Sequence, residues 1–274
     1  MVKREAVLVC PPRITEYKTT GSPVSVPLAY IQYDNMLAEL VRRGIRIVKI
    51  ADKSGSPDAV FIRDPFIETP THTVVAKFRN PMRVKETINV YETSPSGASS
   101  NPKKPDYIVE RGFLEGGDYL CDRGISFIMA GPRTSRLAIR DMMMADVFGT
   151  VKVARITSGN STIIHLDLML GFIDDVAVIW SGAKRFVVDV YERTGRQIAS
   201  LPLSEYLKHL GYTLFEITDK EQRDFVCNFV VFDKFVLATE GSQRLAGATQ
   251  KPVVCVPLSE FKKMGGGVHC LMNK

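Results

Sequence analysis

The stretch GFLEGGDYLCDRGISFIMAG, residues 112–131, is the clearest copy of a unit that recurs along the chain and decides the fold. In this unit a short apolar strand is interrupted by a polar or acidic residue, and a turn leads to a second strand rich in β-branched and aromatic residues. The other copies are AVFIRDPFIETPTHTVVAKF (59–78), IIHLDLMLGFIDDVAVIW (163–180) and FVCNFVVFDKFVLATE (225–240). A spacing of about 50 residues between copies favours a toroid or an array of modules over a doubly wound sheet.

Helices are predicted between the hairpins, so the chain belongs to the mixed α/β class. The segments LAYIQYDNMLAELVRRG and TSRLAIRDMMMADVFG are the two long ones, which end at Gly44 and Gly149. Two shorter helices, in SEYLKHLG and SEFKKMG, are expected to be capped by Ser204 and Ser259.

A fifth module can be completed only by the two ends of the chain. The last strand, VHCLMN (268–273), would pair with the first, REAVLVC (4–10), and so close a ring. Such pairing would also hold the C-terminal tail, since unanchored termini are usually frayed. Cys270 would then face a central well. The corresponding inner positions of other modules hold Asp64, Glu115 and His165.

The composition is that of one globular domain, residues 1–274. The chain is longer than a typical domain but close to the size that closed α/β architectures reach as one unit. Hydrophobic residues make up 45% and charged residues 24%, and no apolar run approaches the length of a membrane span. We therefore expect a cytoplasmic protein without a membrane partner.

Charge and cysteine content narrow the class of partner. The net charge is +6 and the pI is about 9.0, but Lys and Arg are spread along the chain rather than gathered in a basic patch. An anionic small molecule fits this charge as well as nucleic acid does, and no nucleic-acid partner is expected. Five cysteines, odd in number and without CxxC spacing, indicate free thiols and neither a disulfide framework nor a zinc site.

Several polar residues stand in apolar surroundings, and each has an ordinary structural explanation when it is taken alone. Cys270 follows three glycines and His269; a free cysteine is most often a small buried hydrophobe, although backbone without side chains lets a ligand approach closely. His165 has apolar neighbours, and strand alternation would put Asp167 on the same face. Two polar side chains pointing together from an apolar strand need a reason.

The acidic residues of the repeats point to a cationic ligand. Glu115 and Asp118 flank a Gly-Gly pair that alone indicates a turn, and Asp64 stands in an aromatic strand before a proline. Buried acids require cationic partners. A guanidinium ligand would meet this need, because it is planar, permanently charged and able to give forked hydrogen bonds to carboxylates. No metal-ligand spacing occurs, and we predict neither a metal nor another cofactor.

The motifs FIRDPF, LEGGD, HLD and GGGVHC together resemble the guanidine-modifying enzymes of the amidinotransferase superfamily. They occur in that family's order and span nearly the whole chain. The resemblance implies the pentein fold, a five-fold pseudosymmetric α/β-propeller, closed by pairing of the N- and C-terminal strands. It also implies Cys270 as the nucleophile, His165 as the general acid and base, and Glu115 as the carboxylate that orients the histidine and the substrate.

The same resemblance implies a set of residues that bind the substrate. Asp64 and Asp167 match positions that grip the guanidinium, and Asp118 is assigned to the same group of acids. Arg83 and Arg133 match positions that bind the α-carboxylate of the substrate.

Two further features are implied nearby. Arg79 is a neighbour of the arginine positions, and the segment TTGSPVSVP, residues 19–27, lies where relatives carry a mobile lid.

The details of the motifs favour arginine as the substrate. HLD and RDP look like the arginine deiminase versions, whereas dimethylargininases typically carry a Lys after HL and an acid before the Asp-Pro. The implied mechanism is covalent. The thiolate of Cys270 attacks the guanidinium carbon, His165 protonates the departing amine, and a water that His165 activates hydrolyses the thiouronium intermediate to citrulline.

Several alternatives stay open. The chain is as short as a dimethylargininase, and dimethylargininases, amidinotransferases and arginine dihydrolases would use the same catalytic residues. A non-enzymatic pentein-like protein that binds RNA or the ribosome would not need Cys270, His165 and Glu115 together. The oligomeric state is also open, a homo-oligomer included.

Overall fold

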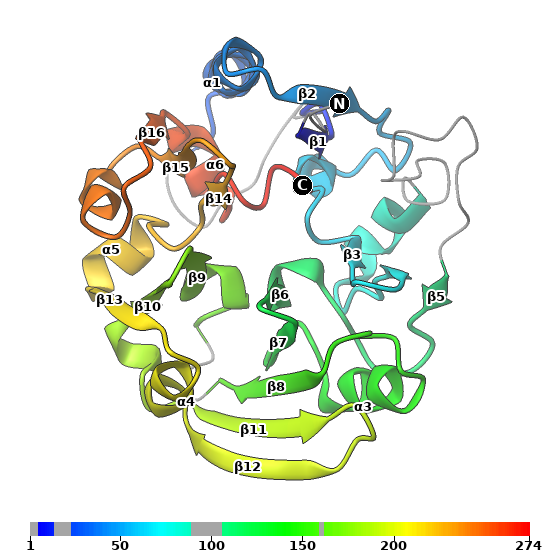
Figure 1. Ribbon diagram of the computed structural model, residues 1–274. Helices are drawn as coiled ribbons and strands as arrows, with labels where there is room; N and C mark the ends of the chain where they lie inside the picture. The colour runs from blue at the N-terminus through cyan, green and yellow to red at the C-terminus, as the bar shows by residue number, and fades with distance from the viewer. Residues whose placement is uncertain (1–4, 14–22, 89–105, 159–161) are drawn as a thin grey trace.

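The structure is a computed structural model that describes residues 5–13, 23–88, 106–158 and 162–274. These residues form five separate β-sheets, and Figure 1 shows them arranged around a common centre, near which the C-terminus lies. Within the described residues, no helix has the length and apolar character needed to cross a bilayer. Because helices and strands alternate along the chain, the fold is of the mixed α/β class that the sequence predicts.

One plan of strand pairing recurs from sheet to sheet. In the first example β3 (Phe66–Glu68) pairs antiparallel with β4 (Thr73–Val75), and β4 pairs in parallel with β5 (Tyr107–Ile108). Three other sheets follow this plan with β6 (Tyr119–Asp122), β7 (Ile125–Ala130) and β8 (Lys152–Thr157); β9 (Leu170–Ile173), β10 (Val176–Trp180) and β13 (Thr213–Ile217); and β14 (Val230–Val231), β15 (Val236–Thr239) and β16 (Val253–Val256). An extra hairpin, β11 (Val187–Glu192) and β12 (Gln197–Pro202), extends the sheet of β6, β7 and β8, with β11 pairing antiparallel to β8.

Central strands of this plan are apolar because they are covered on both faces. All six residues of β7, which lies between β6 and β8, are buried. Near-continuous apolar runs are typical of strands in this position. The antiparallel pair comes from each predicted hairpin, and the parallel strand comes from the segment that follows the intervening connection.

The two ends of the chain meet, but not as the pair of strands that the sequence predicts. β1 (Ala6–Val9) pairs in parallel with β2 (Arg46–Lys49), and the tail adds one antiparallel bridge between Leu8 and Asn273. The prediction of a strand over 268–273 is wrong, because these residues form turns. Contacts outside a ladder anchor the tail instead: Asn273 Nδ2 donates to Ile62 O at 2.7 Å, and the N–H of Arg63 donates to Cys270 O at 3.2 Å.

The predicted helices are present, but the second long one ends at Met144, so the prediction that it continues to Gly149 is wrong. They are α1 (Val26–Arg42), α3 (Arg136–Met144), α4 (Leu203–His209) and α6 (Ser259–Lys263), to which the structure adds α5 (Asp219–Arg223). α1 buries Ala29, Tyr33, Met36 and Leu40, whose spacing puts them on one face of the helix. Gly44 follows this helix with a left-handed φ of 81°, as a C-terminal stop requires.

The predicted N-caps Ser204 and Ser259 are wrong by one residue or two. α4 begins at Leu203 directly after the strand β12, with Pro202 at the cap, and α6 begins at Ser259 itself. The hydroxyl of Ser259 accepts a hydrogen bond from Gln32 Nε2 of α1 at 2.8 Å and donates to Glu260 Oε1 at 3.1 Å, so it caps no backbone N–H of α6.

Short 3₁₀ turns connect many of these elements and carry much of the polar centre. They are η1 (Pro57–Val60), η2 (Pro81–Thr87), η3 (Gly116–Asp118), η4 (Leu166–Leu168), η5 (Ser181–Ala183) and η6 (Gln243–Gly247). Glu115 directly precedes η3 and His165 directly precedes η4, each with extended backbone angles. The two modules therefore present these side chains in the same local setting.

Candidate active site

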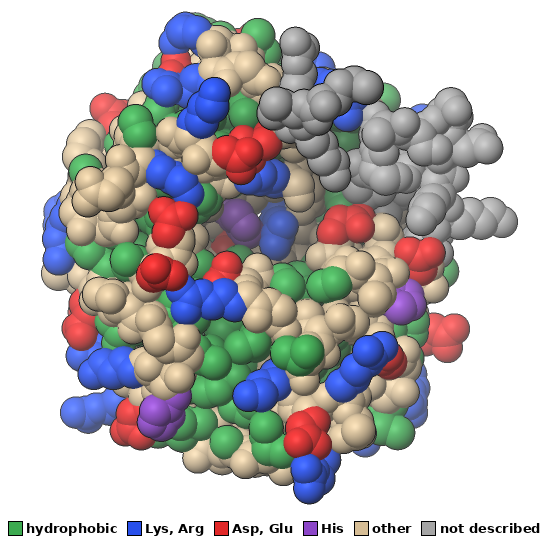
Figure 2. Space-filling model, viewed as in Figure 1, with side chains coloured by type: hydrophobic (Ala, Val, Ile, Leu, Met, Phe, Trp, Pro, Cys, Tyr) green, Lys and Arg blue, Asp and Glu red, His purple; other side chains and the backbone are tan. Residues whose placement is uncertain are grey.

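Five of the predicted residues line one small cavity. This cavity has a volume of about 80 Å³ and is formed where segments from distant parts of the chain meet. Figure 2 shows that the molecule is hollowed near the centre of the face in view, with histidine, basic and acidic side chains around the hollow. The predicted residues that line the 80 Å³ cavity are Cys270, His165, Asp64, Arg83 and Arg133.

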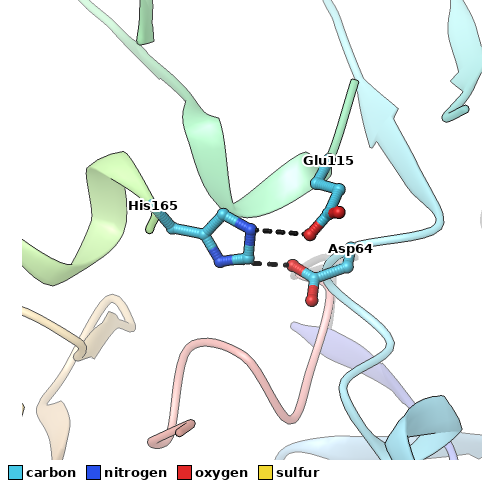
Figure 3. Close-up of side chains that lie close together, drawn as sticks. All are labelled: Asp64, Glu115 and His165. Atoms are coloured by element: carbon cyan, nitrogen blue, oxygen red, sulfur yellow. Dashed lines mark hydrogen bonds and ion pairs between the residues drawn. The ribbon is translucent and has the colours of Figure 1, made fainter. Parts of the chain in front are cut away.

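His165 lies between two carboxylates (Figure 3). Its Nε2 is 3.0 Å from Glu115 Oε2, and its Nδ1 is 3.8 Å from Asp64 Oδ1. Burial alone would lower the pKa of His165, but the charge of Asp64 and the hydrogen bond to Glu115 outweigh burial and raise this pKa to about 10. The imidazole is therefore protonated at neutral pH.

Two features of the site support this arrangement of His165. The pKa of Asp64 is lowered, because the attraction of His165 and Arg83 outweighs the effect of burial, and so its carboxyl group is ionised. Gly117 leaves room for the imidazole, since a Cβ at this position would lie 2.6 Å from His165 Nδ1. The Gly-Gly pair of LEGGD thus has a packing reason in addition to its turn.

The two predicted arginines pair with the buried acids. Arg83 donates from Nη1 to Asp64 Oδ2 at 3.0 Å and from Nη2 to Glu86 Oε2 at 2.7 Å. Arg133 donates from Nη1 to both oxygens of Glu115 at 3.1 and 3.0 Å. The cationic partners that the sequence requires for its buried acids are thus supplied by the protein. The binding of an α-carboxylate by these arginines stays a prediction.

The structure gives little support to two further predictions, Arg79 and the lid segment. Arg79 donates to Pro132 O at 3.1 Å and does not line the cavity. Residues 19–22 of the predicted lid lie outside the described residues, and residues 23–25 lead into α1.

Cys270 is buried, and its sulfur lies between an amide and a carboxylate. Asn228 Nδ2 is 3.3 Å from Sγ, and Asp167 Oδ2 is 3.8 Å from it. Burial and the charges of Asp167 and Asp64 raise the pKa of the thiol well above its ordinary value, against the hydrogen bonds from Gly267 and Asn228. Without a ligand, the sulfur is therefore a thiol at neutral pH.

Asp167 does not share a face with His165 as strand alternation predicts. That prediction is wrong because Leu166–Leu168 forms the 3₁₀ turn η4 rather than a strand. Asp167 Oδ2 lies 2.7 Å from His269 Nδ1, and both residues line a separate cavity of about 350 Å³ together with Arg63. Asp167 thus reaches the Cys270 sulfur from a different cavity than His165 does.

Asp118 is fully buried and does not line the candidate site. Its Oδ1 accepts the N–H of Leu166 at 3.1 Å, and the residue lines neither of the two central cavities. Burial raises its pKa to about 8, although His165 acts in the opposite direction. The geometry supports a role in holding the turn after His165, and the expected contact between Asp118 and a ligand has no support in it.

Three residues of the polar centre are not among those predicted from the sequence: Asn228, Glu86 and Arg63. Asn228 was visible as the polar centre of the fourth repeat, and an amide in the apolar run FVCNFVVF could have been assigned to the central well on that ground. Glu86 and Arg63 gave no comparable signal, since each has a partner from a distant segment: Ser56 for Glu86 and Asn273 for Arg63.

A metal ion is a poor fit to the donors that are present. Asp64, Glu115 and His165 each offer one ligand atom, and these atoms lie within 4.8 Å of one another. However, Arg83 and Arg133 already donate to the two carboxylates. A metal ion would have to displace these guanidinium groups, whereas a ligand that donates hydrogen bonds could join them.

A known protein family matches most of this chain. The family model described as N,N dimethylarginine dimethylhydrolase, eukaryotic, matches residues 23–274. The uncharacterized protein ZK1307.1 of Caenorhabditis elegans is 23% identical over 276 residues, which cover 97% of this chain and 92% of that protein.

Solved structures share the fold at low sequence identity. One is a cysteine-to-serine mutant of the dimethylargininase of Pseudomonas aeruginosa in complex with citrulline, with a TM-score of 0.76, 18% identity and 98% of both chains covered. Another is the N-terminal domain of ArgZ, an arginine dihydrolase of cyanobacteria, with a TM-score of 0.78, 18% identity, and 99% of this chain and 97% of that chain covered. With the family model spanning most of the sequence, the chain belongs to the eukaryotic N,N-dimethylarginine dimethylhydrolase family of the pentein superfamily.

Proposed function

We propose that this protein hydrolyses a C–N bond in the guanidino group of L-arginine or a close derivative, with Cys270 as the nucleophile. The proposal rests on one carboxylate oxygen in the cavity that accepts no hydrogen bond from the part of the protein that the structure describes. Asp64 Oδ1 is buried and has no hydrogen-bond partner among the described residues, and Asp64 lines the same cavity as Cys270 and His165. A buried carboxylate oxygen without a donor is costly, so a ligand rich in N–H groups would be stabilised there.

The carboxylate of Asp64 favours a guanidinium as the ligand. Asp64 is ionised, and its Oδ2 already accepts one hydrogen bond from Arg83. The free oxygen can accept a second bond from a planar cation, which a guanidinium supplies with fixed geometry. The α-carboxylate of an amino-acid substrate would find Arg133, whose side chain is 28% exposed, at the edge of the same cavity.

The ionisation states support a substrate-assisted reaction. A cation beside Asp64 and Cys270 offsets the negative charges that raise the pKa of the thiol, and so favours loss of the thiol proton to solvent. The thiolate attacks the guanidinium carbon, and the protonated His165 gives its proton to the departing nitrogen. Neutral His165 then takes a proton from water, the hydroxide adds to the thiouronium carbon, and collapse releases the thiolate and the ureido product.

Dimethylarginine is the second candidate substrate, and the family model favours it. The sequence argument against it depended on Asp167 holding an unsubstituted nitrogen. In the structure Asp167 is paired with His269 and lines the other cavity. This contact weakens that argument without favouring either substrate. Amidino transfer and arginine dihydrolysis would use the same residues.

The arrangement of modules supports a closed five-fold ring. Four sheets have an antiparallel pair followed by a parallel strand, and the tail with β1 and β2 repeats that order through the bridge at Leu8. We propose that this is the propeller of the pentein fold, with the two chain ends completing the fifth module.

The proposal is tested by product analysis with L-arginine, asymmetric dimethylarginine and agmatine in parallel. We expect citrulline and ammonia from arginine, or citrulline and dimethylamine from dimethylarginine, and no turnover by the Cys270→Ser variant. Turnover of agmatine alone would contradict the proposed role of Arg133. If none of the three substrates is hydrolysed by protein with native circular dichroism, the hydrolase proposal fails.

A further inference from the structure

We propose that Asn228 is the residue that positions the Cys270 sulfur and stabilises its thiolate, through the amide group of its side chain. The inference rests on the proposed role of Cys270 as the nucleophile. It adds a function for a residue that contributes no charge to the site and that does not line the cavity beside His165.

The orientation of the Asn228 amide follows from its neighbours. The residue is fully buried, and its Oδ1 accepts the N–H of His269 at 2.9 Å and the N–H of Cys270 at 3.4 Å. Backbone N–H groups can only donate, so the oxygen must face the tail. The nitrogen therefore faces the sulfur, at 3.3 Å from Sγ.

This contact serves both protonation states of the sulfur. In the thiol form the S–H group can donate to Asn228 Oδ1 at 3.6 Å. In the thiolate form the sulfur accepts from Nδ2 instead, as a charge-assisted hydrogen bond. Since the same amide also holds the backbone of His269 and Cys270, the sulfur is held in one place throughout the proton transfer.

A neutral donor suits this position better than a cationic one. The charges of Asp167 and Asp64 oppose ionisation of the thiol, so some group must favour the thiolate. A lysine or arginine beside the sulfur would do so, but it would also repel a guanidinium substrate at the same place. An amide stabilises the anion by hydrogen bonding alone and leaves the carboxylates available to a cation.

Gly267 supports the same interpretation. A Cβ at Gly267 would lie 2.7 Å from Asn228 Oδ1, closer than a real Cβ contact allows. The glycine run before Cys270, which the sequence analysis connected with ligand approach, thus also makes room for the amide at one of its three positions.

The test follows the ionisation of Cys270 without any substrate. The rate of carboxamidomethylation of Cys270 by iodoacetamide is measured against pH by mass spectrometry of its peptide, in the intact protein and in Asn228→Ala and Asn228→Asp. We expect the thiolate to form at a pH about one unit higher in Asn228→Ala, so that alkylation at a given pH is about tenfold slower. Asn228→Asp keeps the shape and the acceptor oxygen but ionises before the thiol does, and it should slow alkylation further.

Two controls separate thiolate stabilisation from general loosening of the tail. Asn273→Ala removes another buried amide of the tail, which contacts Ile62 O and Arg63 but not the sulfur, and its pH midpoint should equal that of the parent protein. The exposed Cys121 in the same samples should alkylate at an unchanged rate. The proposal is overturned if a folded Asn228 variant has the same pH midpoint of Cys270 alkylation as the parent protein. It is also overturned if Asn273→Ala shifts that midpoint by as much as the Asn228 variants do.

A second readout needs no change at Asn228. In protein with ¹⁵N-labelled asparagine, the side-chain amide signal of Asn228 should move as Cys270 ionises and should lose this pH response in Cys270→Ala. An amide signal that ignores the state of Cys270 would contradict the contact. Neither readout uses a substrate. The contact between Asn228 and Cys270 is therefore tested independently of the proposed hydrolase activity.

Discussion

His165 and His269 each lie beside a carboxylate near Cys270, yet their protonation is shifted in opposite directions. His165 lies 3.0 Å from Glu115, and its pKa is raised to about 10. His269 lies 2.7 Å from Asp167, but burial and the charge of Arg63 lower its pKa in spite of that carboxylate. A carboxylate partner therefore does not determine the charge of a histidine; burial and the sum of the neighbouring charges do, and of these two histidines His165 is the one suited to be a general acid.

The largest expected effect distinguishes the two histidines by activity. His165→Asn should reduce kcat on the best substrate by roughly 10²–10⁴-fold, because the proton donor to the leaving nitrogen is lost. His269→Asn, with the same change of residue, should retain most of the activity. Steady-state kinetics would decide the matter, and similar losses in both variants would show that the two environments do not divide the roles as we propose.

A backbone substitution should affect one histidine only. Gly117→Ala places a Cβ 2.6 Å from His165 Nδ1, so the imidazole has to move away from Glu115. We expect a loss of stability of about 1–3 kcal/mol, as in other overpacked cores, together with a lower kcat. Gly247→Ala is the matched control, since its Cβ would meet only Phe215 at 3.4 Å. Urea unfolding of both variants measures the difference.

Removing the charge of Glu115 should lower the pKa of His165 towards that of an ordinary histidine. In Glu115→Gln the pKa of His165 should fall by about one unit, since the opposite charge is lost at hydrogen-bond distance. The alkaline limb of the pH–kcat profile should move to lower pH by the same amount. An unchanged alkaline limb in an active, folded variant would mean that a group other than His165 supplies the proton.

The last comparison of the two histidines concerns the pH dependence of stability. The folded protein holds the proton of His165 to a higher pH than the unfolded chain does, so this histidine stabilises the fold fully below about pH 6.5 and loses that effect as the pH rises towards 10. The lowered pKa of His269 has the opposite sign, and its contribution is lost as the pH falls. The free energy of unfolding of each histidine variant, compared with the parent across pH 5–10, should show these opposite slopes.

Much of the site could be predicted because its residues stand in recognisable local patterns. Cys270, His165 and Asp64 line one cavity, and Glu115 contacts His165, as the four motifs indicate. The errors concern contacts that depend on the path of the backbone. The motif HLD resembled a strand because its neighbours are apolar, but Leu166–Leu168 forms a 3₁₀ turn. Asp167 therefore contacts His269 instead of lying on the same face as His165.

The sequence by itself determined the modular plan, the helices, the glycine stop at Gly44 and the main chemical groups of the site. These features follow from periodicity and turn chemistry, which act between residues close together in the chain. Only the tertiary structure decided that Arg83 and Arg133 neutralise the acids, that Asp118 holds a backbone N–H, and that Asn228 holds the sulfur. Each of those contacts joins residues at least 18 positions apart, and its partner is selected by burial, because a buried polar group takes whichever complementary group the fold brings within reach.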